Sequence, residues 1–173
     1  MAEDNYEYII VGGGLAGASA IEGIRENDSN GTILLLSAER HMPYNRPPLS
    51  KGLWLGKKKP EEIFVYDEAF YSENNAEVQV GREVKALDPN RKTVTDSENA
   101  TYGYKKLLLA TGGVPRTLDI PGHDLWPLCY YRYIDDYLRI RQEANDGERS
   151  ALVVGGGFIG SEIAAGLCEN GVD

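Results

Sequence analysis

The sequence predicts an α/β fold built on doubly wound parallel sheets, and two glycine-rich turns carry this prediction. Residues 12–17 and 155–160 both read G-G-G-x-x-G, follow a short apolar run and lead into a stretch rich in alanine or other helix formers. Strand, tight turn and helix in that order open a βαβ unit. Glycine makes up 20 of the 173 residues, above its usual share of ~7%. The repeated turn therefore indicates a Rossmann-like, nucleotide-binding device that occurs twice.

The elements can be placed in order along the chain from apolar runs and turn residues. Strands are expected at 6–11, 32–37, 107–110 and 151–154, and helices at 15–27, 133–144 and 158–169, with short helices near 49–55 and 67–73. Segments 77–80, 84–87 and 92–95 alternate between apolar and polar residues. They predict a small antiparallel β insertion at about 76–102.

The composition excludes several classes of protein. Hydrophobic residues at 42% and charged residues at 26% are typical of a folded globular chain. The net charge of −9 argues against a nucleic-acid groove and against an anionic membrane surface. No apolar run approaches the ~18 residues of a spanning helix, and the start lacks the features of a secretory signal. A cytoplasmic protein with no nucleic-acid or membrane partner is expected.

The two cysteines, Cys129 and Cys168, lie far apart with no C-x-x-C and no Cys/His cluster. That spacing argues against a disulfide framework, a metal site and a local redox dithiol. We expect ordinary thiols and no bound metal.

The first glycine-rich turn predicts a dinucleotide site. Gly12 would permit the tight turn, Gly14 would let the backbone approach a pyrophosphate, and Gly17 would let helix and strand pack closely. Glu39 lies about 20 residues beyond Gly17, the spacing of a carboxylate that binds a ribose hydroxyl. The alternative is glycine-rich packing with Glu39 as an ordinary surface acid.

The second turn repeats this pattern at Gly155, Gly157 and Gly160. The residue that would separate NAD from NADP is expected about 20 positions further on, beyond Asp173, so the cofactor preference stays open. Glu162 occupies the position of Ser19 in the first copy. Its simplest interpretation is an acid that stabilises a helix N-terminus.

The proline-rich segment 43–54 contains Arg46, a planar group suited to phosphate, and Lys51, a movable point charge. By itself this segment is also compatible with a stiff surface loop. Four motifs now stand in order along the chain: V-G-G-G-L-A-G at 11–17, P-Y-N-R-P-P-L-S-K-G-L-W at 43–54, A-T-G-G-V-P-R at 110–116 and V-G-G-G-F-I-G-S-E at 154–162. Together they resemble the FAD-dependent pyridine nucleotide oxidoreductases of the ferredoxin reductase and apoptosis-inducing factor type.

The resemblance implies a role for each motif. The FAD pyrophosphate would bind at the first glycine-rich turn and its adenosine ribose at Glu39. The remaining FAD contacts would come from Arg46, Lys51, Thr111, Gly112 and Arg116. NAD(P)H would bind at Gly155, Gly157 and Gly160, with Glu162 beside the nicotinamide and within reach of Lys51. Lys51 and Glu162 would then be the catalytic pair, and Lys51 would place a cation beside the flavin.

The implied activity is hydride transfer from NAD(P)H to FAD, followed by electron transfer to a ferredoxin-like or other acceptor. The disulfide reductases of the same superfamily use a C-x-x-C, which is absent here. The alternative function is a non-catalytic FAD- or nucleotide-binding module or an inactive fragment of such an enzyme. The sequence does not decide whether the protein forms a homo-oligomer.

The resemblance also implies a domain division. Residues 1–118 would form most of an FAD domain and 119–173 the beginning of an NAD(P) domain, together less than half of a family member. The apolar run 151–154 would have to pack against further residues of a longer polypeptide, against another chain or against the FAD domain.

Overall fold

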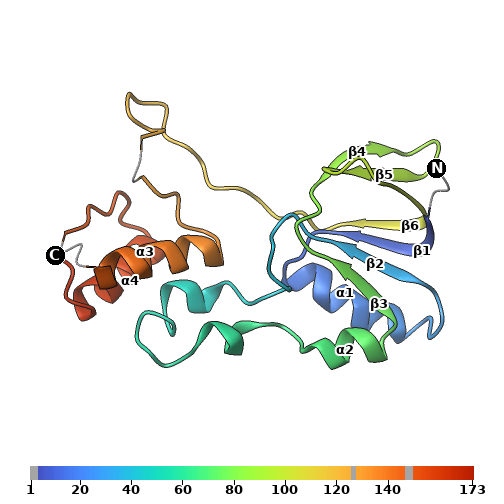
Figure 1. Ribbon diagram of the computed structural model, residues 1–173, viewed down its shortest axis with the longest axis horizontal. Helices are drawn as coiled ribbons and strands as arrows, with labels where there is room; N and C mark the ends of the chain where they lie inside the picture. Colours follow the sequence, from blue (N-terminus) through green and yellow to red (C-terminus); the bar gives the residue numbers. More distant parts are fainter. Residues whose placement is uncertain (1–3, 126–127, 147–149) are drawn as a thin grey trace. The chain divides into compact units, whose positions relative to one another are not determined.

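The computed structural model describes residues 4–125, 128–146 and 150–173, and the chain divides into two compact units (Figure 1). The first unit contains the described residues up to Asn45 together with Phe64–Gly112. The second contains Arg46–Ile63 together with the described residues from Gly113 onwards. The chain therefore passes between the units three times, and the proline-rich segment belongs to the second unit.

The first unit is a six-stranded sheet with β1 near its centre. Its strand order is β3-β2-β1-β6-β5-β4, with β1 at Asp4–Val11, β2 at Ile33–Leu36, β3 at Ala76–Gln79, β4 at Val84–Asp88, β5 at Thr93–Asp96 and β6 at Thr101–Leu109. β1 pairs in parallel with both β2 and β6. The predicted α/β class with its parallel sheet is confirmed.

Alternate residues of the central strands pack on opposite faces of the sheet, as the period of a strand requires. One face buries Ile10 and Leu35 against α1 (Leu15–Arg25) and α2 (Glu68–Glu73), which Figure 1 shows on the same side. The other face buries Ile9 and Val11 with residues of β5 and β6. Both faces of the carboxyl-terminal part of β1 are covered, which explains its continuous apolar run Ile9–Val11.

β3 differs from the expectation that 76–102 forms one antiparallel insertion. β3 pairs in parallel with β2 and extends the central sheet, because α2 carries the chain back before the strand begins. Only β4 and β5 are antiparallel, with β5 pairing on β6. Alternation of apolar and polar residues indicates a half-buried strand but not the direction in which it pairs. The direction of β3 follows from the short helix α2, which carries the chain back before the strand begins.

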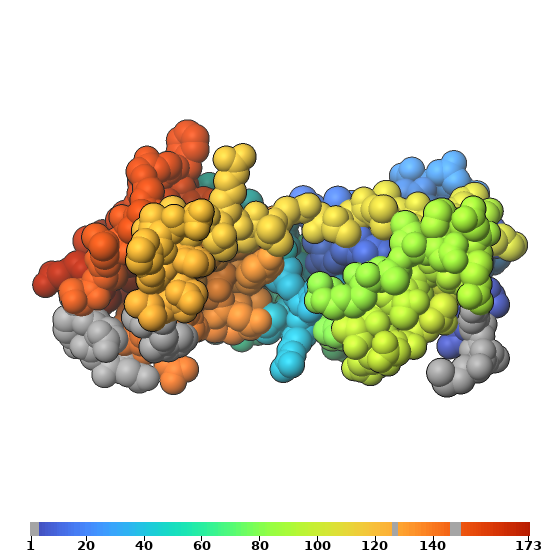
Figure 2. Space-filling view, turned by 90° about the horizontal axis from the view of Figure 1, so that it is seen from above, coloured from blue at the N-terminus to red at the C-terminus, as the bar shows by residue number. Residues whose placement is uncertain are grey.

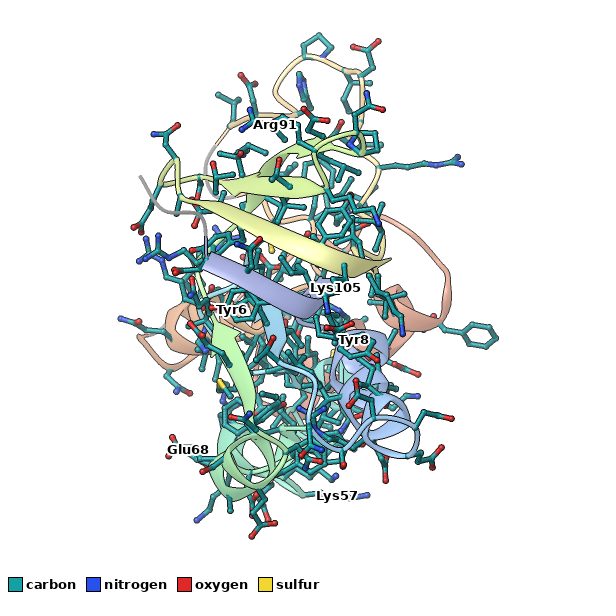
Figure 3. The ribbon with its side chains drawn as sticks, turned by 90° about the vertical axis from the view of Figure 1, so that its right-hand side faces the viewer. Tyr6, Tyr8, Lys57, Glu68, Arg91 and Lys105 are labelled. Carbon is teal, nitrogen blue, oxygen red and sulfur yellow. The ribbon has the colours of Figure 1, made fainter. Side chains whose placement is uncertain are left out.

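The amino-terminal part of β1 is held by polar contacts of two tyrosines, both labelled in Figure 3. Tyr6 donates a hydrogen bond to Glu77 at 2.7 Å, and Tyr8 donates one to Asp28 at 2.9 Å. Burial and the neighbouring Glu77 carboxylate raise the pKa of Tyr6. The backbone N–H groups of Asn30 and Gly31, followed by the Tyr8 hydroxyl, hold the pKa of Asp28 below its usual value. These contacts fix the end of the strand opposite the glycine-rich turn.

The second unit contains two α-helices, α3 (Ile134–Asp146) and α4 (Phe158–Glu169), and two 3₁₀ turns, η1 (Pro47–Ser50) and η2 (Pro60–Ile63). The short helix expected near 49–55 is wrong: the 3₁₀ turn η1, with prolines at its first positions, ends at Ser50, and residues 51–55 continue as turns. None of the helices in the described ranges has the length and apolar character needed to cross a bilayer.

The prediction of a strand at 151–154 is wrong. These residues form no strand, and the side chains of Leu152 and Val154 are 90% and 72% exposed. A strand needs a neighbouring strand to satisfy its backbone groups, and the described part of the second unit contains none. The backbone contact that is present runs from Ala151 N–H to the Asp173 carbonyl at 2.7 Å.

Candidate functional site

The candidate site of the first unit lies at the carboxyl ends of the parallel strands. Val11, at the end of β1, is opposite Leu36 of β2 and Leu109 of β6. The chain therefore leaves all three strands at the same edge of the sheet. Ligands of open parallel sheets bind outside this edge. The residues predicted to form the first site, at 12–17, 39 and 111–112, all follow these strand ends.

In the first glycine-rich turn, Gly12 and Gly17 are closely packed, and the approach of a pyrophosphate to Gly14 stays a prediction. Gly12 has a φ of +125°, and an added Cβ would lie 2.1 Å from the carbonyl oxygen of Ala110. A Cβ on Gly17 would lie 2.0 Å from the carbonyl oxygen of Gly12. A Cβ on Gly14 would meet no described atom within 4 Å. Gly12 and Gly17 are thus required by packing, while Gly14 faces the open space that a pyrophosphate needs.

The N-terminus of α1 is suited to an anion. The helix begins directly after Gly14, has no acidic residue in its first turn, and no side chain of the described residues caps it. The unpaired N–H groups of a first helical turn carry partial positive charge and bind phosphate oxygens. The turn and the helix together fit a pyrophosphate.

Glu39 follows β2 at the same edge and is half-buried. Its carboxylate Oε2 accepts a hydrogen bond from the hydroxyl of Tyr44, which is only 3% exposed. The sequence alone does not indicate a role for Tyr44, because nothing in a proline-rich loop reveals which side chain its tyrosine contacts. It also missed Gly13, where an added Cβ would lie 2.3 Å from the Oγ of Ser37.

Thr111 and Gly112 follow β6 beside the turn. Ala110 N–H donates to the Val11 carbonyl at 2.8 Å, which keeps this strand end against β1. From Thr111 the chain continues as an exposed segment, yellow in Figure 2, that includes Arg116.

The second glycine-rich turn repeats the backbone of the first. Gly155 has a φ of +124°, and a Cβ on Gly160 would lie 2.0 Å from the Gly155 carbonyl oxygen. Gly157 precedes α4, and its Cβ position is open within 4 Å. No acidic residue lies in the first turn of α4, and within the described ranges no side chain caps it. This turn, too, fits a pyrophosphate.

Three side chains of the second unit meet at Glu162. The Lys51 ammonium lies 3.5 Å from Glu162 Oε1, and the Ser50 hydroxyl donates to Oε2 at 2.6 Å. Lys51 and Glu162 are 57% and 29% exposed, so the ion pair is accessible to solvent and to a ligand. The structure thus brings together the two residues expected to lie within reach. Ser50 was missed, since its partner lies 112 positions away in the sequence.

The segment that carries Ser50 and Lys51 is anchored by aromatic residues. Trp54 is 2% exposed, packs edge-on against Tyr137 and donates from its indole N–H to the Tyr131 hydroxyl at 3.1 Å. The Tyr131 hydroxyl in turn donates to the Leu49 carbonyl at 2.5 Å, and burial raises its pKa. These contacts hold η1 against the segment before α3.

Arg46 also contacts that segment. Its guanidinium donates to the Arg132 carbonyl at 3.1 Å and lies 5.2 Å from the centre of the Tyr133 ring. The group predicted to bind phosphate is therefore engaged with the protein in this structure.

The cysteines are free thiols, and burial raises the pKa of Cys129. A raised pKa disfavours the reactive thiolate. In the described ranges no group of three or more Cys, His, Asp or Glu side chains is arranged to hold a metal ion.

The family model for pyridine nucleotide-disulphide oxidoreductases matches residues 6–173, and the chain belongs to this family. Its members use FAD and a pyridine nucleotide, so the resemblance and the cofactor class predicted from the motifs are confirmed at the level of the family. Two glycine-rich turns with the same backbone agree with a family that binds two dinucleotides.

Two curated relatives are similar over nearly the whole chain. A mitochondrial apoptosis-inducing factor 1 of Dictyostelium discoideum is 33% identical over 96% of this chain and 34% of its own length. A ferredoxin–NAD(P)(+) reductase of Sphingomonas sp. is 34% identical over 99% of this chain and 41% of its own length.

A solved structure, the NADH:rubredoxin oxidoreductase of Clostridium acetobutylicum, superimposes with a TM-score of 0.87 at 27% identity. The match covers 98% of this chain and 43% of that protein. The chain therefore spans roughly two fifths or less of the length of the curated relatives to which it is similar.

Proposed function

We propose that this chain carries the FAD site and part of the NAD(P)H site of an FAD-dependent oxidoreductase. The observation that carries the proposal is the pair of glycine-rich turns, with φ of +125° at Gly12 and +124° at Gly155, each opening a helix without an acidic first turn. Family membership and the parallel sheet below the first turn support it.

The first unit is assigned to FAD. Gly12, Gly14 and Gly17 would hold the pyrophosphate, and Glu39 would accept hydrogen bonds from the adenosine ribose. Thr111 and Gly112 would line the cofactor from the end of β6. Arg46 and Arg116 would contribute positive charge to the phosphates, for which Arg46 would exchange its present contacts with residues 132–133.

The second turn is assigned to NAD(P)H, with Gly155, Gly157 and Gly160 at its pyrophosphate. Lys51 and Glu162 would lie at the reacting end of the cofactors. FAD bound there would supply the redox chemistry, that is, hydride acceptance from NAD(P)H and single-electron transfer to an acceptor. The residues of this chain supply orientation and charge: Lys51 presents an ammonium where negative charge develops, and Glu162 holds that ammonium in place.

The electron acceptor is proposed to be a small iron–sulfur or rubredoxin-like carrier. The names of the similar proteins support this class, since one reduces ferredoxin and another rubredoxin. The absence of a C-x-x-C agrees with direct transfer from the flavin rather than through a dithiol.

A nucleotide-binding protein without turnover is the second candidate. It is favoured by the exposed residues around the second turn, where Leu152 and Phe158 are 90% and 92% exposed. Hydride transfer needs two cofactors held in close contact, and an uncovered turn holds its ligand weakly.

Flavin spectroscopy separates these candidates and tests the proposal itself. The purified chain mixed with FAD should acquire a protein-bound flavin spectrum. Anaerobic NADH should bleach it if the chain is catalytic and leave it unchanged if it only binds. No bound flavin would refute the proposal.

A matched pair of variants locates the FAD site. Gly14→Ala should weaken FAD binding about tenfold or more, because a methyl group would fill the space needed by the pyrophosphate. Gly23→Ala is the control, since its Cβ position is equally open but lies further along α1. Equal FAD affinity in the two variants would contradict the assignment.

A further inference from the structure

The loop that carries Glu39 is fixed to the rest of the first unit by backbone hydrogen bonds. Ser37 N–H donates to the Gln79 carbonyl at 2.9 Å, and Arg82 N–H donates to the Ser37 carbonyl at 2.7 Å. Gly81 N–H donates to the carbonyl of Glu39 itself at 2.8 Å. The turn between β3 and β4 therefore holds the main chain of Glu39 in place. These bonds fix the backbone and do not themselves set the torsions of the Glu39 side chain.

A buried tyrosine restrains that side chain. Tyr44 is 3% exposed, forms an isolated β-bridge with Phe64, and donates its hydroxyl to Glu39 Oε2. Next to it, Val65 N–H donates to the Pro43 carbonyl at 2.8 Å. The main chain around Tyr44 is thus held by these backbone contacts, and the hydroxyl of its buried ring restrains the Glu39 carboxylate. A hydrogen bond to an ionised carboxylate is among the stronger ones in proteins.

The bond leaves the carboxylate able to bind a ligand. An ionised carboxylate has about four acceptor sites, so a hydrogen bond from the Tyr44 hydroxyl does not by itself exclude further donors. A pair of ribose hydroxyls needs two acceptor directions that are set in advance. A glutamate side chain with no restraint would lose rotamer freedom on binding, which lowers affinity.

We infer that Tyr44 is a positioning residue for the adenosine ribose: it orients the Glu39 carboxylate so that the carboxylate accepts hydrogen bonds from the ribose hydroxyls. This inference rests on the proposed FAD site and adds the residue that sets its selectivity for a ribose diol. Tyr44 acts through Glu39 and needs no contact with the nucleotide.

The test compares two ligands that differ only in those hydroxyls, ADP and 2′,3′-dideoxy-ADP, by calorimetric titration of the full chain. The wild type should bind ADP more tightly than the dideoxy compound. Tyr44→Phe removes only the hydroxyl and should weaken ADP binding roughly three- to tenfold. It should leave binding of the dideoxy compound unchanged, so the selectivity falls.

Two further variants distinguish positioning from a general effect on the loop. Glu39→Gln should lower the selectivity at least as much as Tyr44→Phe. The double variant should lose no more than Glu39→Gln alone, because Tyr44 acts through that carboxylate. Equal weakening of both ligands by Tyr44→Phe would mean a distorted loop and would overturn the inference.

The outcomes also separate this inference from the proposed function. If the wild type binds FAD and prefers ADP over the dideoxy compound, but Tyr44→Phe keeps that preference, only the role of Tyr44 is refuted. If the wild type binds neither FAD nor ADP, the FAD site and the inference fall together.

Discussion

The two glycine-rich turns have the same backbone but different surroundings. Gly12 and Gly155 have φ of +125° and +124°, and in both turns the last glycine lies against the carbonyl of the first at a distance of 2.0 Å from its Cβ position. Around the first turn, a Cβ on Gly12 would meet Ala110 at 2.1 Å, whereas Gly155 has nothing within 4 Å. Among the described residues, the same glycine spacing therefore accompanies the same turn geometry both beside a sheet and without a neighbouring strand.

Substitution of the first glycine in each turn should give the largest difference in stability between the two turns. Gly12→Ala combines an unfavourable φ with a backbone clash, and we expect it to prevent the first unit from folding. Gly155→Ala carries only the conformational cost, about 1–3 kcal/mol. Circular dichroism and urea unfolding measure both. Equal destabilisation by the two variants would show that the contact with Ala110 contributes nothing.

The stability of the second unit should depend on Trp54, as the stability of the first unit depends on its sheet. Trp54 is 2% exposed, and Gly166 of α4 packs on it so closely that an added Cβ would lie 2.7 Å away. Trp54→Ala should cost about 3–5 kcal/mol, as expected for a large buried side chain. Hydrogen exchange should show lost protection in α3 and α4 and unchanged protection in β1 and β2. Loss of protection in β1 and β2 as well would mean that the units unfold together.

Two tyrosines, one in each unit, should give a smaller difference in the free energy of unfolding. Tyr131 bonds to Leu49 and Trp54, whereas the buried Tyr71 hydroxyl has no hydrogen-bond partner among the residues that the structure describes. Tyr131→Phe should therefore cost about 1–3 kcal/mol, and Tyr71→Phe should be neutral or slightly stabilising at pH 7. Thermal unfolding of both variants checks the ranking, and the reverse order would contradict these contacts.

Tyr71 should also make the first unit sensitive to alkaline pH. Burial raises its pKa from the ordinary value near 10 to about 12. The folded state then holds this proton more tightly than the unfolded state, so the group leaves stability unchanged below pH ~10 and lowers the free energy of unfolding as the pH rises towards ~12. Urea unfolding at about pH 9 and about pH 11 should show a smaller loss of stability for Tyr71→Phe than for the wild type. An identical loss would assign the alkaline sensitivity to other groups.

The smallest effect on stability is expected at the Lys51 and Glu162 pair. Lys51 is 57% exposed and its ammonium lies 3.5 Å from the carboxylate, so Lys51→Met should change the free energy of unfolding by less than about 1 kcal/mol. If the proposed function holds, the same variant should slow the reduction of bound flavin by NADH. An unchanged reduction rate would remove Lys51 from the site.

Elements with both a periodic sequence and a local partner were predicted well. The expected strands at 6–11 and 32–37 and the helix between them are β1, β2 and α1 within a few residues. Glycine spacing also predicted the close packing of Gly12 and Gly17 in the first turn, though not that of Gly13. These features depend on residues near one another in the chain, which a single sequence reports directly.

What the sequence did not reveal depends on distant partners. The direction of β3 is decided by its pairing with β2, and the run 151–154 has strand composition but no neighbouring strand in the described residues. The contacts of Ser50 with Glu162 and of Tyr44 with Glu39 join side chains whose meeting is set by the folded loop. Residue type alone identified the charged members of these pairs and passed over the hydroxyl groups that orient them.

The three crossings of the chain between its units decide where the protein can be cut. A polypeptide truncated after Gly112 would keep residues 46–63 but lose α3 and α4, against which Trp54 packs through Tyr137 and Gly166. It would then present a large indole and several aliphatic groups to water, a surface that promotes self-association. An isolated first unit suited to crystallisation would need a short polar bridge in place of that segment, joining Asn45 directly to Phe64.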